Sequence, residues 1–241
     1  MVVPLYQEEA AVPGLSTGLR EFLRTESVQR DVDFVLVDDG STDRTLALLH
    51  QHFADLPARI VAHERNRGLT EALLTGSRAA RGSMVGWLDS DLTYEPDVLR
   101  RLALLIDAGA DVALSSCYHP EGGVEGVARW RLMLSRFASR FYRRTTGCPV
   151  HTFTSMVRVY RREVLERCVP IEGGFHGIAE VLLQAIVSRY QIAEAPAVLH
   201  RRLVGESKMK VLRTGIGHLR LMWRYGRLAR YMTAGMRRAA V

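Results

Sequence analysis

Two short stretches of this 241-residue chain decide its fold: VLVDDGSTD at residues 35–43 and MVGWLDSD at residues 84–91. In each stretch an apolar run ends in aspartates, Asp38 and Asp39 in the first and Asp89 and Asp91 in the second. Such runs are typical of strands that are buried on both faces of a parallel sheet. Because ligands bind outside the carboxyl ends of such strands, we expect both acidic clusters at one ligand-binding edge.

The same alternation of apolar runs and helical patterns extends through the first half of the chain. Strands are predicted at residues 2–5, 34–37, 60–62, 84–88 and 112–114, with helices near 13–23, 44–52, 70–80 and 96–106. Strands that alternate with helices indicate an α/β fold, an open and mostly parallel Rossmann-like sheet flanked by helices.

The second half of the chain is less regular. It begins with a glycine-containing loop, and a basic helix, a strand, two helices and two short strands are expected after it, at residues 116–127, 129–144, 154–160, 161–167, 178–190, 191–195 and 197–200 respectively. A polar loop at 201–208 precedes a basic helical tail. Because no linker divides the chain, we expect one domain over residues 1–208 and a tail over 209–241.

Composition narrows the class of protein. The chain is 47% hydrophobic and carries three cysteines, too few for a disulfide framework, and its N-terminus lacks the pattern of a secretory signal, so we expect a cytoplasmic location. Nine basic residues and no acidic residue lie at 208–241, whereas residues 1–207 carry 24 basic and 26 acidic residues. Because the excess positive charge belongs to the tail, we do not expect a nucleic-acid partner.

Asp89 and Asp91 are candidate metal ligands. Aspartates two residues apart at the end of a strand can direct oxygens toward one point, and Mg²⁺ or Mn²⁺ prefers oxygen ligands. A plainer alternative is that both residues open the next helix as caps, and DDGSTD at 38–43 also forms a good turn and N-cap.

Four segments in this order and spacing resemble glycosyltransferase family 2, whose fold is called GT-A: PLYQEE at 4–9, VDDGSTD at 37–43, RNRGL at 65–69 and DSD at 89–91. The resemblance implies an inverting, metal-dependent enzyme with a UDP- or GDP-linked sugar donor. It places the nucleotide-sugar and metal half at residues 1–115 and the acceptor half at 116–208. The donor-binding residues that it implies are Pro4, Tyr6, Glu8, Asp38, Asp39, Asn66, Gly68, Asp89, Ser90 and Ser207.

The second half is similar to the polyprenyl-phosphate branch of that family, which resembles dolichol-phosphate mannose synthase. The matching segments are YRREVL at 160–165, Gly174-Phe175 with Glu180, and RLVGESK at 202–208. By this resemblance Arg202 and Lys208 close over the donor diphosphate, and with Asp91 they form the implied catalytic set. The chain departs from the branch at 152–158, where TFTSMVR replaces the usual DPTSGFR.

A basic stripe on the helix at 129–144 is the expected acceptor side. The implied acceptor-binding residues are Arg129, Arg131, Ser135, Arg136 and Glu180. Arginine can bind a lipid phosphate through two hydrogen bonds, and a phosphate nucleophile needs no strong general base. A hydroxyl acceptor would need one, and Glu180 is the only candidate. The stripe could also be a solvated helix face, and a non-catalytic sugar-nucleotide-binding protein is a third alternative.

The tail carries two apolar rows at helical spacing, which are Leu212, Ile216, Leu219 and Trp223 in one and Leu221, Tyr225, Leu228 and Met232 in the other. Such a basic amphipathic helix suits an anionic membrane surface, which would make the protein peripheral on the inner face of the membrane. The alternative is that the tail packs on the domain or on a second subunit, so a homodimer is left open.

Overall fold

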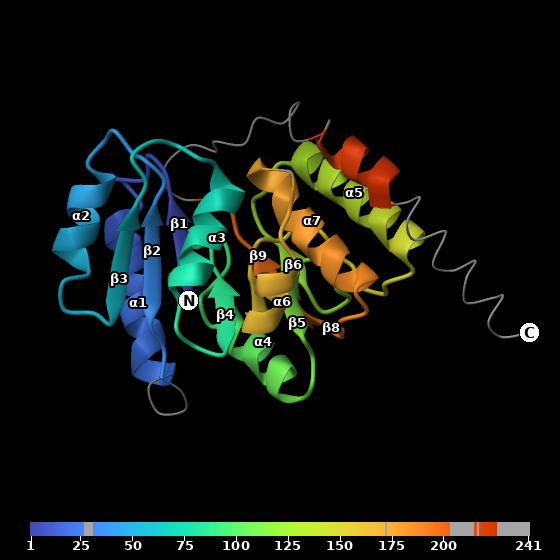
Figure 1. Ribbon diagram of the computed structural model, residues 1–241, viewed down its shortest axis with the longest axis horizontal. Coiled ribbons are helices and arrows are strands. Elements are labelled where there is room, and N and C mark those ends of the chain that lie inside the picture. The colour runs from blue at the N-terminus through green and yellow to red at the C-terminus, as the bar shows by residue number, and fades with distance from the viewer. Residues whose placement is uncertain (27–30, 172, 203–214, 216, 226–241) are drawn as a thin grey trace, which may run out of the picture.

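A seven-stranded sheet forms the centre of the molecule (Figure 1). The computed structural model describes residues 1–26, 31–171, 173–202, 215 and 217–225. The strands of this sheet lie in the order β3-β2-β1-β4-β7-β5-β8. Their bounds are β1 Val2–Leu5, β2 Phe34–Asp38, β3 Ala58–Ala62, β4 Met84–Trp87, β5 Val112–Ser116, β7 Arg158–Arg161 and β8 Ile192–Pro196. The predicted open, mostly parallel α/β sheet is confirmed, since β7 alone of these strands is antiparallel to its neighbours.

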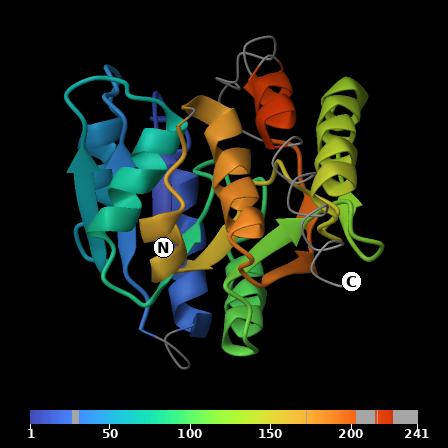
Figure 2. The ribbon, with the colours of Figure 1, turned by 45° about the vertical axis from the view of Figure 1, so that its right-hand side comes forward.

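Helices cover both faces of the sheet, as the two views in Figures 1 and 2 show. They are α1 Val12–Glu26, α2 Thr45–His52, α3 Leu69–Ala79, α4 Val98–Asp107, α5 Arg129–Thr146, α6 Arg162–Arg167 and α7 Gly174–Val187. In β2, Val35 and Val37 belong to a core shared with α3 and α7, whereas Phe34 and Leu36 face α1 and α4. The strand is apolar throughout because both of its faces are buried.

The strand predicted near 154–160 begins later, at Arg158. The residues before Arg158 are held by side-chain hydrogen bonds. Ser155 Oγ lies 2.8 Å from Ser115 Oγ, and Thr152 Oγ1 lies 2.7 Å from Ser116 Oγ. These side-chain hydrogen bonds attach the segment to the carboxyl end of β5. The glycine-containing loop also holds a strand that was not predicted, β6 Gly123–Val124, which pairs with β9 Val198–Leu199.

The helical residues 217–225, called here the C-terminal helix, pack on the domain. Leu221, Met222 and Tyr225 are buried in the core shared with α5 and α7, whereas Leu219 and Trp223 are 61% and 69% exposed. Packing on the domain, the alternative for the tail, therefore holds for these residues. The other predicted members of the two rows, Leu212, Ile216, Leu228 and Met232, lie outside the described residues. No helix in the described part of the chain is both long and apolar enough to span a bilayer.

We expect the C-terminal helix to make stability depend on pH through His218. Burial, followed by the charge of His176, lowers the pKa of His218 from 6.5 to about 4. Between these values the unfolded chain binds a proton that the folded chain does not, so stability falls as the pH is lowered. The loss is at most about 1.4 kcal/mol per pH unit.

Urea denaturation at pH 7.5 and pH 5 measures this loss. His218→Asn, which keeps a hydrogen-bonding group for the Tyr142 hydroxyl, should reduce the difference between the two pH values. Exposed His50→Asn is the matched control and should leave the difference unchanged. Equal pH dependence in the wild type and His218→Asn would contradict the assignment.

Candidate functional site

The loops that follow β1 and β2 are joined by hydrogen bonds at the carboxyl edge of the sheet. The Gln7 amide donates to Ser41 Oγ at 2.9 Å, and the Glu8 amide donates to Thr45 Oγ1 at 2.8 Å. The Gln7 side chain adds a bond from Nε2 to Thr42 Oγ1 at 2.8 Å. The hydroxyls of 41–45 therefore fix the loop that carries Tyr6 and Glu8.

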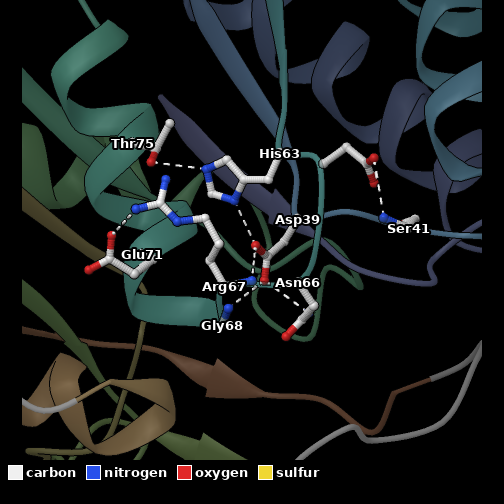
Figure 3. Close-up of polar contacts among 9 residues, drawn as sticks. Asp39, Ser41, His63, Asn66, Arg67, Gly68, Glu71 and Thr75 are labelled. Atoms are coloured by element: carbon white, nitrogen blue, oxygen red, sulfur yellow. Dashed lines mark hydrogen bonds and ion pairs between the residues drawn. The ribbon is translucent and has the colours of Figure 1, made fainter.

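Asp39 fixes a third loop, the one after β3 (Figure 3). One of its oxygens lies 2.7 Å from His63 Nδ1 and accepts from the Arg67 amide at 2.9 Å. The other accepts from Asn66 Nδ2 at 3.0 Å and from the Gly68 amide at 2.7 Å. Asp39 is 3% exposed, so its carboxylate organises residues 63–68 from inside the protein. The sequence prediction missed His63, although it directly follows a predicted strand at the same edge.

Gly40 is required where this third loop meets the turn after β2. Its φ is +70°, and a Cβ placed on it would lie 2.3 Å from the Arg65 carbonyl carbon. A larger residue would push the two loops apart, because that approach is far closer than atoms in van der Waals contact.

Asp38 differs from its neighbour because one of its oxygens has no partner within the described part of the chain. The side chain is 2% exposed, and Oδ2 accepts from the Ser41 amide at 3.4 Å. Among the described residues, Oδ1 makes no hydrogen bond. A buried carboxylate oxygen without a donor is unfavourable, so Asp38 is suited to accept an N–H group from a bound ligand.

Glu8, Asp91 and Arg202 converge although the chain separates the first and the last by 194 residues. Arg202 Nη2 donates to Glu8 Oε2, and Arg202 Nε lies 3.4 Å from Asp91 Oδ2. Burial first, and then the charge of Asp91, raises the pKa of Asp89 to about 8, while Arg202 acts in the opposite direction. The carboxylates of Glu8, Asp89 and Asp91 therefore lie close together at this acidic centre, which favours the binding of a positively charged ligand or ion.

The donor set at this centre fits a divalent cation that is shared with a ligand. The described residues hold no group of three or more His, Cys, Asp and Glu side chains that could bind a metal ion. Asp89 and Asp91 would therefore supply two carboxylates, and phosphate oxygens and water the remaining positions. Mg²⁺ is commonly bound in this way. The capping alternative is wrong, because the next helix, α4, begins at Val98, and the Thr93 amide that donates to Asp91 Oδ1 at 3.2 Å belongs to the turn before it.

The remaining predicted donor residues lie along the same edge. Pro4 is buried in β1, Tyr6 and Ser90 are half-buried in the loops after β1 and β4, and Asn66 and Gly68 lie in the loop after β3. Ser207 and Lys208 lie outside the described residues.

Two of the predicted acceptor residues, both on α5, contact the segments that follow β5 and precede β7. Ser135 Oγ lies 2.6 Å from Thr154 Oγ1, and the Arg136 guanidinium stands 5.0 Å from the Tyr118 ring centroid. Burial raises the pKa of the neighbouring Cys117, which a hydrogen bond from Tyr94 and the charge of Arg136 partly offset. The sequence prediction missed Tyr94 and Cys117, which lie within electrostatic reach of Asp89 and Arg136 respectively. The pKa of Tyr94 is raised chiefly by burial, and the charges of Cys117 and Asp89 add to the shift.

The other predicted acceptor residues lie elsewhere. Arg129 and Arg131 are exposed in the first turn of α5, and Arg131 stands 5.3 Å from the Trp130 ring centroid. Glu180 is fully buried, and it accepts from the Tyr225 hydroxyl and the Ile171 amide, each at 3.0 Å. This geometry makes Glu180 a structural carboxylate, because an enclosed side chain that holds the C-terminal helix cannot reach an acceptor.

Comparison with known families and proteins gives consistent results. The family model described as glycosyl transferase family 2 matches residues 1–169. The chain is 34% identical over 218 residues to the polyprenol monophosphomannose synthase of Mycolicibacterium smegmatis, covering 87% of this chain and 80% of the relative. It is 28% identical to the dolichol-phosphate mannosyltransferase of Pyrococcus furiosus over 87% of this chain, but it spans only 58% of that protein.

The fold also resembles that of a solved structure. The glucosyl-3-phosphoglycerate synthase of Mycobacterium tuberculosis, crystallised with Mn²⁺, uridine diphosphate and phosphoglyceric acid, superposes with a TM-score of 0.69 at 21% identity. The alignment covers 93% of this chain and 77% of that one.

We expect Asp39→Ala to be strongly destabilising, because it removes the acceptor of four hydrogen bonds and leaves buried donors unsatisfied. The expected loss is about 2–4 kcal/mol in the free energy of unfolding, measured by urea denaturation. Asp55→Ala is the control, since it breaks the exposed Arg20–Asp55 pair, which water screens, and should lower the free energy of unfolding far less. Similar losses in the two variants would argue against the role given to Asp39.

Proposed function

Because the chain belongs to glycosyl transferase family 2, we propose that it is an inverting, metal-dependent enzyme that moves a sugar from a nucleotide-diphosphate donor to a polyprenyl phosphate. The single observation that carries the proposal is the convergence of Glu8, Asp91 and Arg202 beside Asp89 at the carboxyl edge of the sheet.

The donor nucleotide is proposed to lie over the loops after β1, β2 and β3. Asp38 Oδ1 is buried and receives no hydrogen bond from the residues that the structure describes, and both uracil and guanine carry N–H groups that could satisfy it. Asp39 then acts as a positioning residue, because its oxygens already accept hydrogen bonds from the loop at 63–68. This arrangement supports a UDP- or GDP-linked sugar.

Asp89 and Asp91 are proposed to hold Mg²⁺ or Mn²⁺ against the donor diphosphate. The bound cation would neutralise the charge that develops on the leaving diphosphate. The solved relative holds Mn²⁺ together with uridine diphosphate, which supports a divalent cation of this kind. Arg202 contacts Asp91 and Glu8, from which its guanidinium could turn to the leaving diphosphate, and we propose the same role for Lys208.

A phosphate acceptor suits the residues that border the centre. A phosphate monoester has a second pKa of about 6, so at neutral pH it is largely anionic and needs no strong general base. A hydroxyl acceptor needs a base, and the only candidate, Glu180, is enclosed. Arg136 and Ser135 are the described residues that we propose to bind the acceptor phosphate. The names of the two relatives, both polyprenyl or dolichol phosphate enzymes, support the same acceptor.

Such a lipid acceptor places the reaction at a membrane. We propose that the protein is peripheral on the cytoplasmic leaflet, whose anionic lipids attract basic segments such as residues 208–241.

The first test concerns the metal and the nucleotide. Mn²⁺ with UDP or with GDP should raise the melting temperature more than either component alone, because ligands that bind only the folded state stabilise it. Asp91→Asn should abolish the additional shift, whereas Asp97→Asn, which alters an exposed aspartate directly before α4, should keep it. Absence of any joint shift with either nucleotide in the wild type would refute the proposed donor site.

The second test measures sugar transfer to polyprenyl phosphate with polyprenol as the control acceptor. We expect product with the phosphate only. Arg202→Ala should lower turnover by about 10²–10³, the usual effect of removing one transition-state charge contact. Its exposed neighbour Arg201 provides the matched control, Arg201→Ala, which should retain turnover. Transfer to polyprenol alone would instead favour a hydroxyl acceptor.

A further inference from the structure

The turn that carries Asp89 and Asp91 contains a residue in the left-handed region of backbone conformation. Leu92, directly after Asp91, has a φ of +51°. A positive φ is uncommon for residues other than glycine, because the Cβ atom then lies too close to the following carbonyl oxygen. Residues held in this way cost free energy and persist only where the surrounding structure fixes them. Other contacts of the fold must therefore hold Leu92 in this conformation.

The side chain of Leu92 packs against helix α1 at a point where only glycine leaves room for it. A Cβ placed on Gly18 would lie 2.6 Å from Leu92 Cδ1, far closer than atoms in van der Waals contact. Leu92 also packs against the core shared by α1 and α4, so it can move away from α1 only by disturbing that packing. Gly18 therefore provides the space that the Leu92 side chain occupies.

A second glycine of α1 provides a comparison. Gly14 lies one helical turn before Gly18 and on the same side of the helix. Glycine is less favourable than alanine in a helix, because it loses more backbone freedom on folding. A Cβ on Gly14 would meet open space, with no neighbouring segment within 4 Å. Contact with Leu92 therefore accounts for the glycine at position 18, and no such contact applies at position 14.

Hydrogen bonds connect the backbone of Leu92 to both aspartates. The Leu92 amide donates to the Asp89 carbonyl oxygen at 3.4 Å, which closes a tight turn. The Thr93 amide donates to Asp91 Oδ1 at 3.2 Å, so the residue after Leu92 directly fixes the Asp91 carboxylate. Because φ of Leu92 sets the direction of the Thr93 amide, a change in that angle would also move the hydrogen bond that Asp91 accepts.

The same turn holds the segment that carries Arg202. The Thr93 carbonyl oxygen accepts from the His200 amide at 2.8 Å, and Arg202 follows two residues later. Arg202 Nε lies 3.4 Å from Asp91 Oδ2. The carboxylates and the arginine of the acidic centre therefore both depend on how the backbone turns at Leu92.

We propose that Leu92 and Gly18 are positioning residues for the divalent cation. Leu92, packed against Gly18, holds the turn that directs the carboxylates of Asp89 and Asp91 toward one point. Neither residue has to touch the cation, the donor or the acceptor. The inference deepens the proposed function and rests on it for the bound ion, whereas the packing of Leu92 on Gly18 exists without any ligand.

The plainer alternative is that Leu92 is a core residue whose strain has no role. Its burial argues against this, because Leu92 is only half-buried and apolar burial offsets less strain than it would for an enclosed leucine. The positions of such residues also argue against it. In the described part of the chain, three residues other than glycine have a positive φ, namely Gln7, Leu92 and Arg189. Two of these three are direct chain neighbours of Glu8 and Asp91, which lie in the acidic centre.

Two alanine substitutions in one helix test the packing. Mn²⁺ binding to the full chain is measured by electron paramagnetic resonance of the free ion, with UDP and with GDP present in separate titrations. Gly18→Ala should weaken Mn²⁺ binding by about tenfold, because the added methyl group displaces Leu92. Gly14→Ala is the matched control and should bind Mn²⁺ as the wild type does. Equal Mn²⁺ affinities in the two variants would overturn the proposal.

Two apolar substitutions of similar volume test the backbone conformation. Leu92→Ile places a branch at Cβ, which disfavours a positive φ, and should weaken Mn²⁺ binding by about tenfold. Leu92→Met has no such branch and should stay within about twofold of the wild type. If both variants lose the same affinity, side-chain shape alone accounts for the loss and the proposal is wrong.

A double variant tests whether Gly18 acts through Leu92. In Leu92→Gly the backbone accepts a positive φ without strain, and the side chain that meets Gly18 is absent. Adding Gly18→Ala to this variant should leave its Mn²⁺ affinity unchanged, although the same substitution weakens binding in the wild type. A loss of equal size in both backgrounds would contradict the assignment.

Hydrogen exchange provides a readout that needs no metal. In Gly18→Ala the His200 amide, which donates to Thr93, should exchange about tenfold faster, whereas the Gly68 amide on Asp39 should exchange as in the wild type. Faster exchange at both amides would indicate a general loss of stability and would overturn the positioning role. A wild type that binds no Mn²⁺ with either nucleotide refutes the proposed metal site, whereas Mn²⁺ binding that Gly18→Ala leaves unchanged refutes this inference alone.

Discussion

The geometry of the site depends on the hydrogen bonds that Asp39 accepts beneath the loop after β3. Its two oxygens accept from four donors, of which the Arg67 and Gly68 amides belong to the backbone of the loop. With those donors satisfied, the loop can lie against Gly40, and the turn at 40–45 can bind the loop after β1. Three loops are thus connected, the one after β3 through Asp39 and the one after β1 through the hydroxyls of the turn after β2. Asp38, directly before Asp39, has an oxygen that accepts no hydrogen bond from the described residues.

Much of this arrangement could be predicted because the information is local. A strand buried on both faces must be apolar throughout, so VLV at 35–37 and the aspartates that follow it indicate both the strand and the edge. Thr45, Ser41 and Asp39 are close to that strand in sequence. The antiparallel direction of β7 could not be predicted in this way, because it depends on how the chain returns from α5 and not on the residues of the strand.

Side chains whose partners are distant in sequence could not be assigned. From the sequence Glu180 is a candidate base, but in the fold it accepts a hydrogen bond from the hydroxyl of Tyr225, 45 residues later. For helix α5 the sequence does not show which face packs on the domain. The buried face consists of Ala138, Ser139 and Tyr142, whereas the largest apolar side chains of the helix face outward. Periodicity identifies the stripes of a helix, but only the fold determines which stripe faces the core.

The contacts of the C-terminal helix join two other helices of the domain. The Tyr142 hydroxyl of α5 lies 2.9 Å from His218 Nδ1, and the Glu180 carboxylate of α7 accepts from the Tyr225 hydroxyl at 3.0 Å. Because one short helix makes both contacts, a substitution at either of them should also weaken the other. The C-terminal helix is therefore a common attachment for the half of the domain that carries Ser135 and Arg136.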